Sequence, residues 1–238
     1  MNQKRWVIPD IHGYAKTLQA LLAQIRPAKE DHLIFLGDYI DRGPDSKAVI
    51  DEIMLLQDKG YRVTPLMGNH EEYLLRNHAF AVENQGFSNL LKPNKLKKEW
   101  YEFGGKETVK SFGIKNIKDI PMKYIAWMEK LEYYIEFNDC VIVHAGLNFN
   151  STDVFQDKRA MTWAKEFKII PSKIGYRQLI HGHTPVDLEY IHLCVSKEKH
   201  DFIDLDNGVY MTKKPGFGNL LAYELNTKLI VTQYNVDE

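Results

Sequence analysis

The first third of the chain alternates between apolar runs of strand length and segments with helical periodicity. The strand-like runs are RWVI at 5–8, HLIFL at 32–36 and YRVTPLM at 61–67. The segments between them repeat apolar residues at helical spacing, and the second one ends at Gly60. This β-α-β-α-β order predicts a parallel sheet covered by helices, in which ligands bind beyond the carboxyl ends of the strands.

The remainder of the chain predicts further strands and one helical segment. Residues 72–130 are polar and helical in pattern, and we expect them to form an insertion over the strand ends within a single domain spanning residues 1–238. Strand-like runs return at 140–143, 178–180, 201–206, 220–225 and 229–234. The last two alternate and are joined by a short turn, which favours antiparallel pairing and a mixed α/β (α+β) fold.

Composition limits the partners of the protein. Its 238 residues carry a formal net charge of −1, so no general attraction to nucleic acid or to an anionic membrane is expected, and an anionic substrate must be held by local cations. Neither a signal peptide nor a segment of transmembrane length is visible, and we expect a cytoplasmic protein. The isolated residues Cys140 and Cys194 are expected to be buried reduced thiols.

Polar residues with adjacent glycines follow each of five predicted strands. They are Asp10 and His12, then Asp38, Asp41 and Arg42, then Asn69 and His70, then His144, and finally His183. Taken singly, each has a structural explanation as a helix cap, a turn residue or a buried histidine. Together they would be costly to bury at one sheet edge unless a cation compensates them.

The ligand types and their number indicate two transition-metal ions. Mixed imidazole and carboxylate ligands suit Mn, Fe, Zn or Co better than Ca or Mg. Asp10, His12 and Asp38 can hold one ion, and Asp38 can bridge to a second ion held with Asn69, His144 and His183. Two divalent cations and two aspartates leave a positive surplus, which matches a phosphate ester.

The motifs PDIHG, GDYIDRG, GNHE, HAG and HGHT, in this order, resemble those of the calcineurin-like metallophosphoesterase superfamily. The resemblance runs from Trp6 to about Gly208 and is strongest to the serine/threonine phosphoprotein phosphatase branch. The sequence is also similar to symmetrical bis(5'-nucleosyl)-tetraphosphatases. The resemblance implies a β-sandwich of two mixed sheets flanked by helices, with two divalent metal ions at the strand ends, Mn first and Fe or Zn as alternatives.

The resemblance also implies a role for each site residue. The metal ligands would be Asp10, His12, Asp38, Asn69, His144 and His183. A water that bridges the metals would be deprotonated and attack phosphorus in line. His70, held by Asp41, would protonate the leaving oxygen, while Arg42, Asn69 and Lys165 would contact the phosphate.

Two positions depart from the family pattern. Pro9 stands where the family usually has glycine, and we expect it to leave the metal site intact because a proline is tolerated at a strand end. Lys165 stands where an arginine is usual, which predicts weaker phosphate affinity or recruitment of Arg159 or Arg177. His181 is expected at the rim rather than as a ligand, and Glu71 is expected to support its loop by hydrogen bonding.

Three functions fit these residues. The first is hydrolysis of phosphomonoesters, with phosphoserine and phosphothreonine proteins as substrates. The second is hydrolysis of a phosphoanhydride, as in bis(5'-nucleosyl)-tetraphosphatases, for which the insertion would supply a nucleotide pocket instead of an open groove. The third is a phosphate-binding module without catalysis. The basic run at 92–98 is expected to be a solvated surface.

Overall fold

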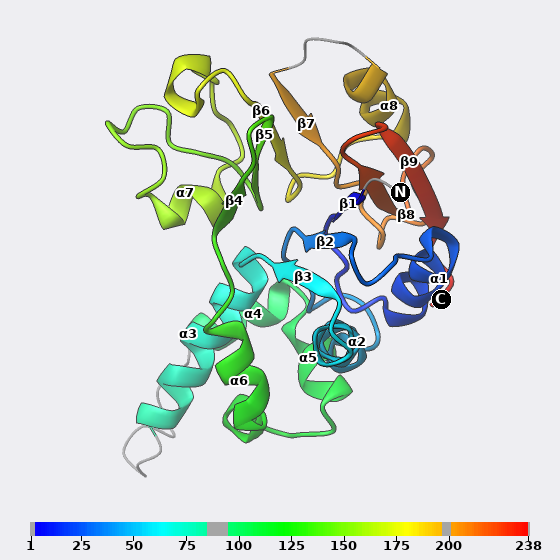
Figure 1. Ribbon diagram of the computed structural model, residues 1–238. Coiled ribbons are helices and arrows are strands. Elements are labelled where there is room, and N and C mark those ends of the chain that lie inside the picture. The colour runs from blue at the N-terminus through cyan, green and yellow to red at the C-terminus, as the bar shows by residue number, and fades with distance from the viewer. Residues whose placement is uncertain (1–2, 85–94, 197–200, 238) are drawn as a thin grey trace.

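Two β-sheets packed face to face form the centre of the molecule, and helices cover their outer sides (Figure 1). The computed structural model describes residues 3–84, 95–196 and 201–237. The first sheet has the order β3 (Arg62–Pro65), β2 (His32–Phe35), β1 (Arg5–Ile8), β8 (Asn219–Glu224) and β9 (Leu229–Tyr234). The second has the order β4 (Tyr134–Glu136), β5 (Cys140–Val143), β6 (Gln178–His181) and β7 (Phe202–Asp204). The predicted sandwich of two mixed sheets is confirmed.

The predicted β-α-β-α-β unit forms half of the first sheet. Strands β1, β2 and β3 are parallel neighbours, connected by α1 (Ala15–Ile25) and α2 (Ser46–Asp58). Strand β8 pairs antiparallel with β1, and β9 pairs antiparallel with β8, as the alternating C-terminal pattern predicts. The carboxyl ends of the three parallel strands therefore lie along one edge.

Both faces of the first sheet are buried at its central strands β1 and β2, which explains why these two strands are continuous apolar runs. Successive side chains of β1 point to opposite faces: Trp6 and Ile8 join the core beneath α1 and α2, while Val7 joins a core with the second sheet. Ile142 of β5 and Ile180 of β6 meet Val7 in that second core. The two-sheet packing is thus specified by strand alternation.

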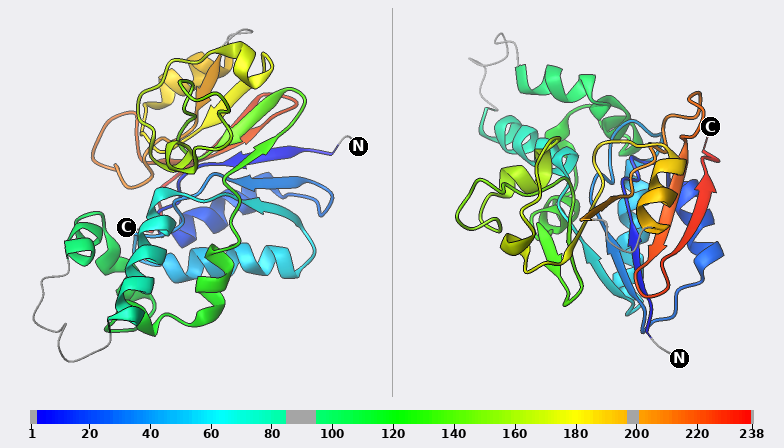
Figure 2. Two further views of the ribbon diagram at one scale, coloured as in Figure 1. Left: turned by 90° about the vertical axis from the view of Figure 1, so that its left-hand side faces the viewer. Right: turned by 90° about the horizontal axis from the view of Figure 1, so that it is seen from above.

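Strand β4 and the two helices that flank the second sheet were not predicted from the sequence. Strand β4 is short and ends in the exposed Glu136, so its sequence lacks an apolar run, and it pairs antiparallel with β5. The second sheet is flanked by α7 (Lys158–Trp163) and α8 (Leu188–Ser196) (Figure 2). The cysteines of β5 and α8, Cys140 and Cys194, are buried and reduced as predicted.

The helical segment that connects the two sheets in the sequence was predicted for residues 72–130. Its first helix begins slightly earlier, at Asn69, soon after the end of β3. Its α-helices are α3 (Asn69–Glu83), α4 (Lys95–Glu102), α5 (Gly105–Ser111) and α6 (Met122–Met128), and they lie together beside α2 and β3 (Figures 1 and 2). Residues 92–94 of the basic run lie outside the described residues, while Lys95 and Lys98 are exposed as expected. None of the helices in the described ranges is both long and apolar enough to cross a membrane.

A histidine buried in β2 gives the fold a predictable sensitivity to acid. Nε2 of His32 lies 2.8 Å from Oγ1 of Thr64. Burial, with Arg62 and Arg5 nearby, lowers the pKa of His32 to about 4. Because the unfolded chain takes up this proton at higher pH than the folded protein, the free energy of unfolding falls as pH drops from about 6.5 toward 4.

We expect His32→Gln to weaken this acid sensitivity. Between pH 7.5 and pH 5, the free energy of unfolding should fall by about 2 kcal/mol more in the wild type than in His32→Gln. Urea unfolding of both proteins at the two pH values measures the difference, and comparing the two proteins cancels the contributions of the other histidines. Parallel pH profiles would contradict the prediction.

Candidate metal centre

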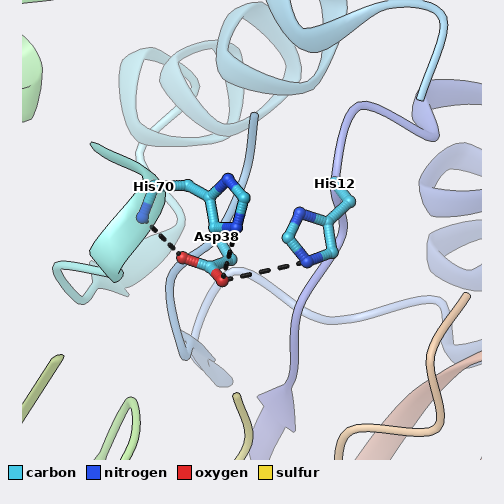
Figure 3. Close-up of side chains that lie close together, drawn as sticks. All are labelled: His12, Asp38 and His70. Carbon is cyan, nitrogen blue, oxygen red and sulfur yellow. Dashed lines mark hydrogen bonds and ion pairs between the residues drawn. The ribbon is translucent and has the colours of Figure 1, made fainter. Parts of the chain in front are cut away.

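Asp38 lies at the centre of the residues that follow the parallel strands (Figure 3). Its Oδ2 atom is 3.8 Å from Nε2 of His12 and 3.8 Å from Nε2 of His70, while its Oδ1 atom is 3.6 Å from Nε2 of His144. All four side chains are buried. Three different strand ends and the second sheet thus contribute to one cluster.

Two groups of possible metal ligands share Asp38. One contains His12, Asp38 and His70, and the other contains Asp38, His144 and His183, with the ligand atoms of each group within 4.8 Å of one another. Asn69 joins the second group, since its Oδ1 atom lies 3.1 Å from Nε2 of His144 and 3.0 Å from Nδ1 of His183. The shared carboxylate is the arrangement expected of a bridging ligand.

Backbone carbonyls fix the imidazoles in the tautomer that a metal requires. Nδ1 of His12 donates to the carbonyl of Ile40 at 3.0 Å, and Nδ1 of His144 donates to the carbonyl of Leu36 at 3.0 Å. A carbonyl can only accept, so each Nε2 atom carries its lone pair toward Asp38. Such second contacts orient metal-binding histidines in proteins.

Asn69 and Asp10 are the polar groups of the cluster that a cation would compensate. One end of the Asn69 amide faces only acceptors, namely the Asp38 carboxylate, Nε2 of His144 and Nδ1 of His183, so this end is either the NH2 group that donates to them or an oxygen that shares a cation with them. The buried Asp10 accepts weak contacts at 3.2 Å from the backbone N–H of His183. Burial, Asp206 and Asp38 raise the pKa of Asp10 well above its usual value, so the carboxylate also requires a cation to remain charged. The residues present therefore fit bound metal.

The charges within the cluster favour an ionised Asp38 and neutral imidazoles. Burial alone would raise the pKa of Asp38, but the four surrounding histidines lower it. Burial lowers the pKa of His144, and burial with His144 as a neighbour lowers the pKa of His183 to about 3. Neutral imidazoles and a carboxylate are the protonation states in which these groups bind metal.

The predicted acid and its partner are in direct contact. Nδ1 of His70 donates to Oδ2 of the fully buried Asp41 at 2.7 Å. Burial would lower the pKa of His70, but Asp38 and Asp41 raise it overall. Nε2 of His70 faces the Asp38 carboxylate, which explains why His70 also belongs to the first possible ligand group.

The insertion supplies two contacts to Asp41 that the sequence prediction missed. Trp100 donates from Nε1 to Oδ2 of Asp41 at 2.8 Å, and Thr108 donates from Oγ1 to Oδ1 at 2.6 Å. The signal in the sequence was the Gly104-Gly105 pair. A Cβ atom at Gly105 would lie 2.3 Å from the Trp100 ring, so only glycine permits this packing. These donors hold the carboxylate that orients His70.

Backbone strain is concentrated among the predicted site residues. Positive φ values occur at His12 (50°), Asp38 (52°), Asp41 (72°), Arg42 (69°) and His183 (75°). Such conformations cost on the order of 1–3 kcal/mol each outside glycine and are typical of functional sites. The backbone N–H groups of Asp38 and Tyr39 donate to the Glu71 carboxylate at 2.9 and 2.8 Å, which confirms that Glu71 supports this loop.

Glycines allow the close approach of the strand ends. A Cβ atom at Gly68 would lie 2.2 Å from Oδ1 of Asp38, and one at Gly182 would lie 2.4 Å from Oδ1 of Asp10. Pro9 follows directly after the last residue of β1, and the Asp10 and His12 that come after it lie in the cluster. Its missing N–H therefore falls just outside the strand.

The four candidate phosphate-binding cations lie at different places. Arg42 stacks its guanidinium on the ring of Tyr210 at 4.1 Å beside the cluster. Lys165 is exposed after α7 and is close enough to His183 to lower the pKa of that histidine, although burial is the main cause. Arg159 stacks near the Trp163 ring at 5.7 Å. Arg177 forms an ion pair with Glu136 at 2.6 Å. It lies just before β6, at the opposite end of that strand from His181, so the structure does not support its recruitment to the phosphate.

We expect Lys165 to limit phosphate affinity. Lys165→Arg should lower the inhibition constant for inorganic phosphate by about threefold to tenfold, because a guanidinium can bind two phosphate oxygens at once. Lys165→Met should raise it by a similar factor. Lys168→Met is the matched control, since Lys168 is also exposed. An inhibition constant that is the same in all three variants would contradict the prediction.

The fold and the cluster together define an α/β protein with a candidate dinuclear metal centre at the carboxyl ends of its strands. The chain belongs to the calcineurin-like phosphoesterase family, whose model matches residues 4–187.

Curated relatives match a shorter part of the chain. A symmetrical bis(5'-nucleosyl)-tetraphosphatase of Bordetella pertussis is 38% identical over 81 residues, which cover 33% of this chain and 28% of that protein. Serine/threonine-protein phosphatase 2 of Escherichia coli is 44% identical over 71 residues, covering 29% and 30% of the two chains. Each match thus spans less than a third of the relative.

Solved structures share the fold over nearly the whole chain. A metallophosphoesterase from Sphaerobacter thermophilus superposes with a TM-score of 0.55 at 17% identity, over 98% of this chain and 88% of that one. A protein serine/threonine phosphatase from Saccharomyces cerevisiae gives a TM-score of 0.57 at 14% identity, over 99% and 81%. At these identities the likeness supports the fold alone.

Proposed function

We propose that this protein hydrolyses phosphomonoesters at a dinuclear metal centre, with phosphoserine and phosphothreonine residues of proteins as substrates. The observation that carries the proposal is the Asp38 carboxylate, which two groups of possible metal ligands share beside the His70–Asp41 pair. The similarity to the Escherichia coli serine/threonine phosphatase supports the choice of substrate.

We assign the metal ions to the side chains that surround Asp38. The ligands would be Asp10, His12, Asp38, Asn69, His144 and His183. Divalent ions held there would supply positive charge for the phosphoryl oxygens and would lower the pKa of water toward neutrality. The mixed nitrogen and oxygen donors suit Mn, Fe or Zn.

The protein itself orients the phosphate and supplies a proton. Arg42, backed by the Tyr210 ring, offers a planar fork for two phosphate oxygens, while Asn69 and Lys165 contact the same group. Asp41 accepts from Nδ1 of His70, which fixes the ring and directs Nε2 toward the cluster. From this atom His70 donates the proton that the leaving oxygen requires.

A second candidate function is hydrolysis of a dinucleoside tetraphosphate. It is supported by the similarity to the Bordetella pertussis tetraphosphatase and by an aromatic-lined cavity beside His144 and His183. Both functions use the same proposed ligands and the same acid, so the leaving group distinguishes them.

The test is a competition between the two substrates. Protein reconstituted with Mn is offered equal amounts of a phosphothreonine peptide and diadenosine tetraphosphate, with His70→Asn as the control. Release of phosphate from the peptide, lost in the variant, supports the first function. Formation of two ADP molecules supports the second function instead. Turnover of neither substrate would favour a phosphate-binding module without catalysis.

A further inference from the structure

Strand β9 forms a long edge of the first sheet and carries neither a charge nor a proline. Its sequence is LIVTQY, and within the described part of the chain it pairs on one side only, with β8 (Figure 1). Leu229 and Tyr234, its first and last residues, are each 50% exposed. An edge strand of this kind presents unpaired backbone N–H and C=O groups, so β9 can accept a further strand.

The other three sheet edges are protected against such pairing. Strand β3 contains Arg62 and Pro65, and Glu132 forms a bridge with the residue that follows this strand. Strands β4 and β7 are only three residues long, and they end in Glu136 and Asp204. Charges, prolines and short strands are the features by which proteins prevent association at a sheet edge. Strand β9 has none of these features.

The outward-facing backbone groups of β9 belong to its alternate residues Ile230, Thr232 and Tyr234. The N–H of Asn235 donates to the carbonyl of Gly218 at 3.0 Å, on the side of β8. Because successive residues of an antiparallel strand face opposite sides, the odd-numbered residues of β9 bond to β8 and the even-numbered ones face away. The side chain of Gln233 donates to the carbonyl of Tyr234 at 2.7 Å, a contact that an outward carbonyl allows. The outward groups are therefore centred on Thr232.

A second copy of the same strand complements these groups. When two β9 strands pair antiparallel about a two-fold axis at Thr232, the two Thr232 residues face each other and Ile230 faces Tyr234 of the second copy. Threonine pairs, and pairs of an aromatic with a β-branched residue, stabilise antiparallel strands. Between them Val231 faces Gln233, so no two like charges meet. The strand is complementary to itself in this register.

We propose that β9 pairs with β9 of a second copy of this chain, so that the two first sheets join into one continuous sheet across a two-fold axis. Pairing of identical edges closes the assembly at a dimer, because the protected edges of the described sheets offer no further open strand. None of the proposed metal ligands lies on β9. The dimer is therefore independent of the proposed hydrolysis.

The mass of the protein in solution tests the dimer. Light scattering after size exclusion should give twice the 27.7 kDa of one chain at about 100 µM, with dissociation near 1 µM, because an interface of about one strand per subunit is small. A mass of 27.7 kDa at the higher concentration would overturn the proposal.

Charge variants locate the two-fold axis. Thr232→Lys and Thr232→Glu each place two like charges opposite one another, so each variant alone should be monomeric. A mixture of the two variants should restore the dimer, because opposite charges then meet at the axis. Thr152→Lys is the matched control and should remain dimeric, since Thr152 is exposed in the loop between β5 and α7. A dimer of Thr232→Lys alone, or a mixture that stays monomeric, would overturn the pairing about Thr232.

Hydrogen exchange reports on the strand itself. In the peptide that contains residues 229–234, the amides of Ile230, Thr232 and Tyr234 should exchange at least about tenfold more slowly in the concentrated than in the dilute wild type. Thr232→Lys should remove this difference and leave turnover unchanged, which shows that the variant is folded. Exchange independent of concentration in the wild type would overturn the dimer. A wild type without turnover would instead refute the proposed hydrolysis, so the two claims fail separately.

Discussion

Asp38→Asn should abolish binding of both metal ions and lower phosphatase turnover by about a thousandfold or more. Asp38 is the one carboxylate common to the two possible ligand groups, and its oxygens face His12 and His70 on one side and His144 on the other. An amide carries no charge to bridge two cations. The loss of several kcal/mol of electrostatic stabilisation corresponds to this factor in rate.

Metal content and turnover are measured on the same preparations. Mass spectrometry should find about two metal ions per wild-type chain after reconstitution and far fewer in Asp38→Asn. Asp58→Asn is the matched control, because Asp58 is exposed at the end of α2. An Asp38→Asn protein that still holds two ions would rule out Asp38 as the bridging ligand.

The residues around Asp38 could be predicted because regular strands bring them together. Asp10, Asp38 and Asn69 follow consecutive parallel strands, and parallel strands end at the same edge of a sheet. His144 and His183 follow β5 and β6, which are likewise parallel neighbours. The periodicity of the strands therefore predicts that these side chains lie close together at the edge of the sheets.

The supports of the site could not be predicted in the same way. Trp100 and Thr108 reach Asp41 from helices whose position depends on tertiary packing, and no local periodicity encodes such a contact. The aromatic cavity is similarly assembled from Phe167, Tyr190 and Phe202, which lie on separate elements. The sequence therefore predicts the candidate metal ligands better than the residues that support them or that line the neighbouring cavity.

The strained loop after β2 carries candidate site residues and is itself held by the residues that support the site. Asp38, Asp41 and Arg42 all adopt positive φ, and the backbone N–H of Asp41 donates to Oγ1 of Thr108 at 2.9 Å. One short loop thereby presents the proposed bridging carboxylate, the partner of the proposed acid and the proposed phosphate-binding cation. The insertion stabilises this loop, so we infer that its helices serve catalysis through Asp41 and not only as a cover.

His70→Asn should lower turnover of a phosphothreonine peptide by about a hundredfold to ten-thousandfold without loss of metal. The alkoxide that leaves from threonine is strongly basic and needs a proton, which Nε2 of His70 is placed to give. Because p-nitrophenolate leaves without protonation, turnover of p-nitrophenyl phosphate should fall much less. The ratio of the two rates therefore measures proton donation separately from general damage to the site.

Two further variants define what His70 and its supports contribute. Trp100→Phe removes one of the donors to Asp41 and should cause a smaller loss with the same dependence on leaving group, since it acts only through the orientation of His70. His192→Asn, at an exposed position of α8, is the matched control and should change neither rate. If His70→Asn instead loses metal and both substrates slow equally, His70 is a metal ligand and the proton comes from another group.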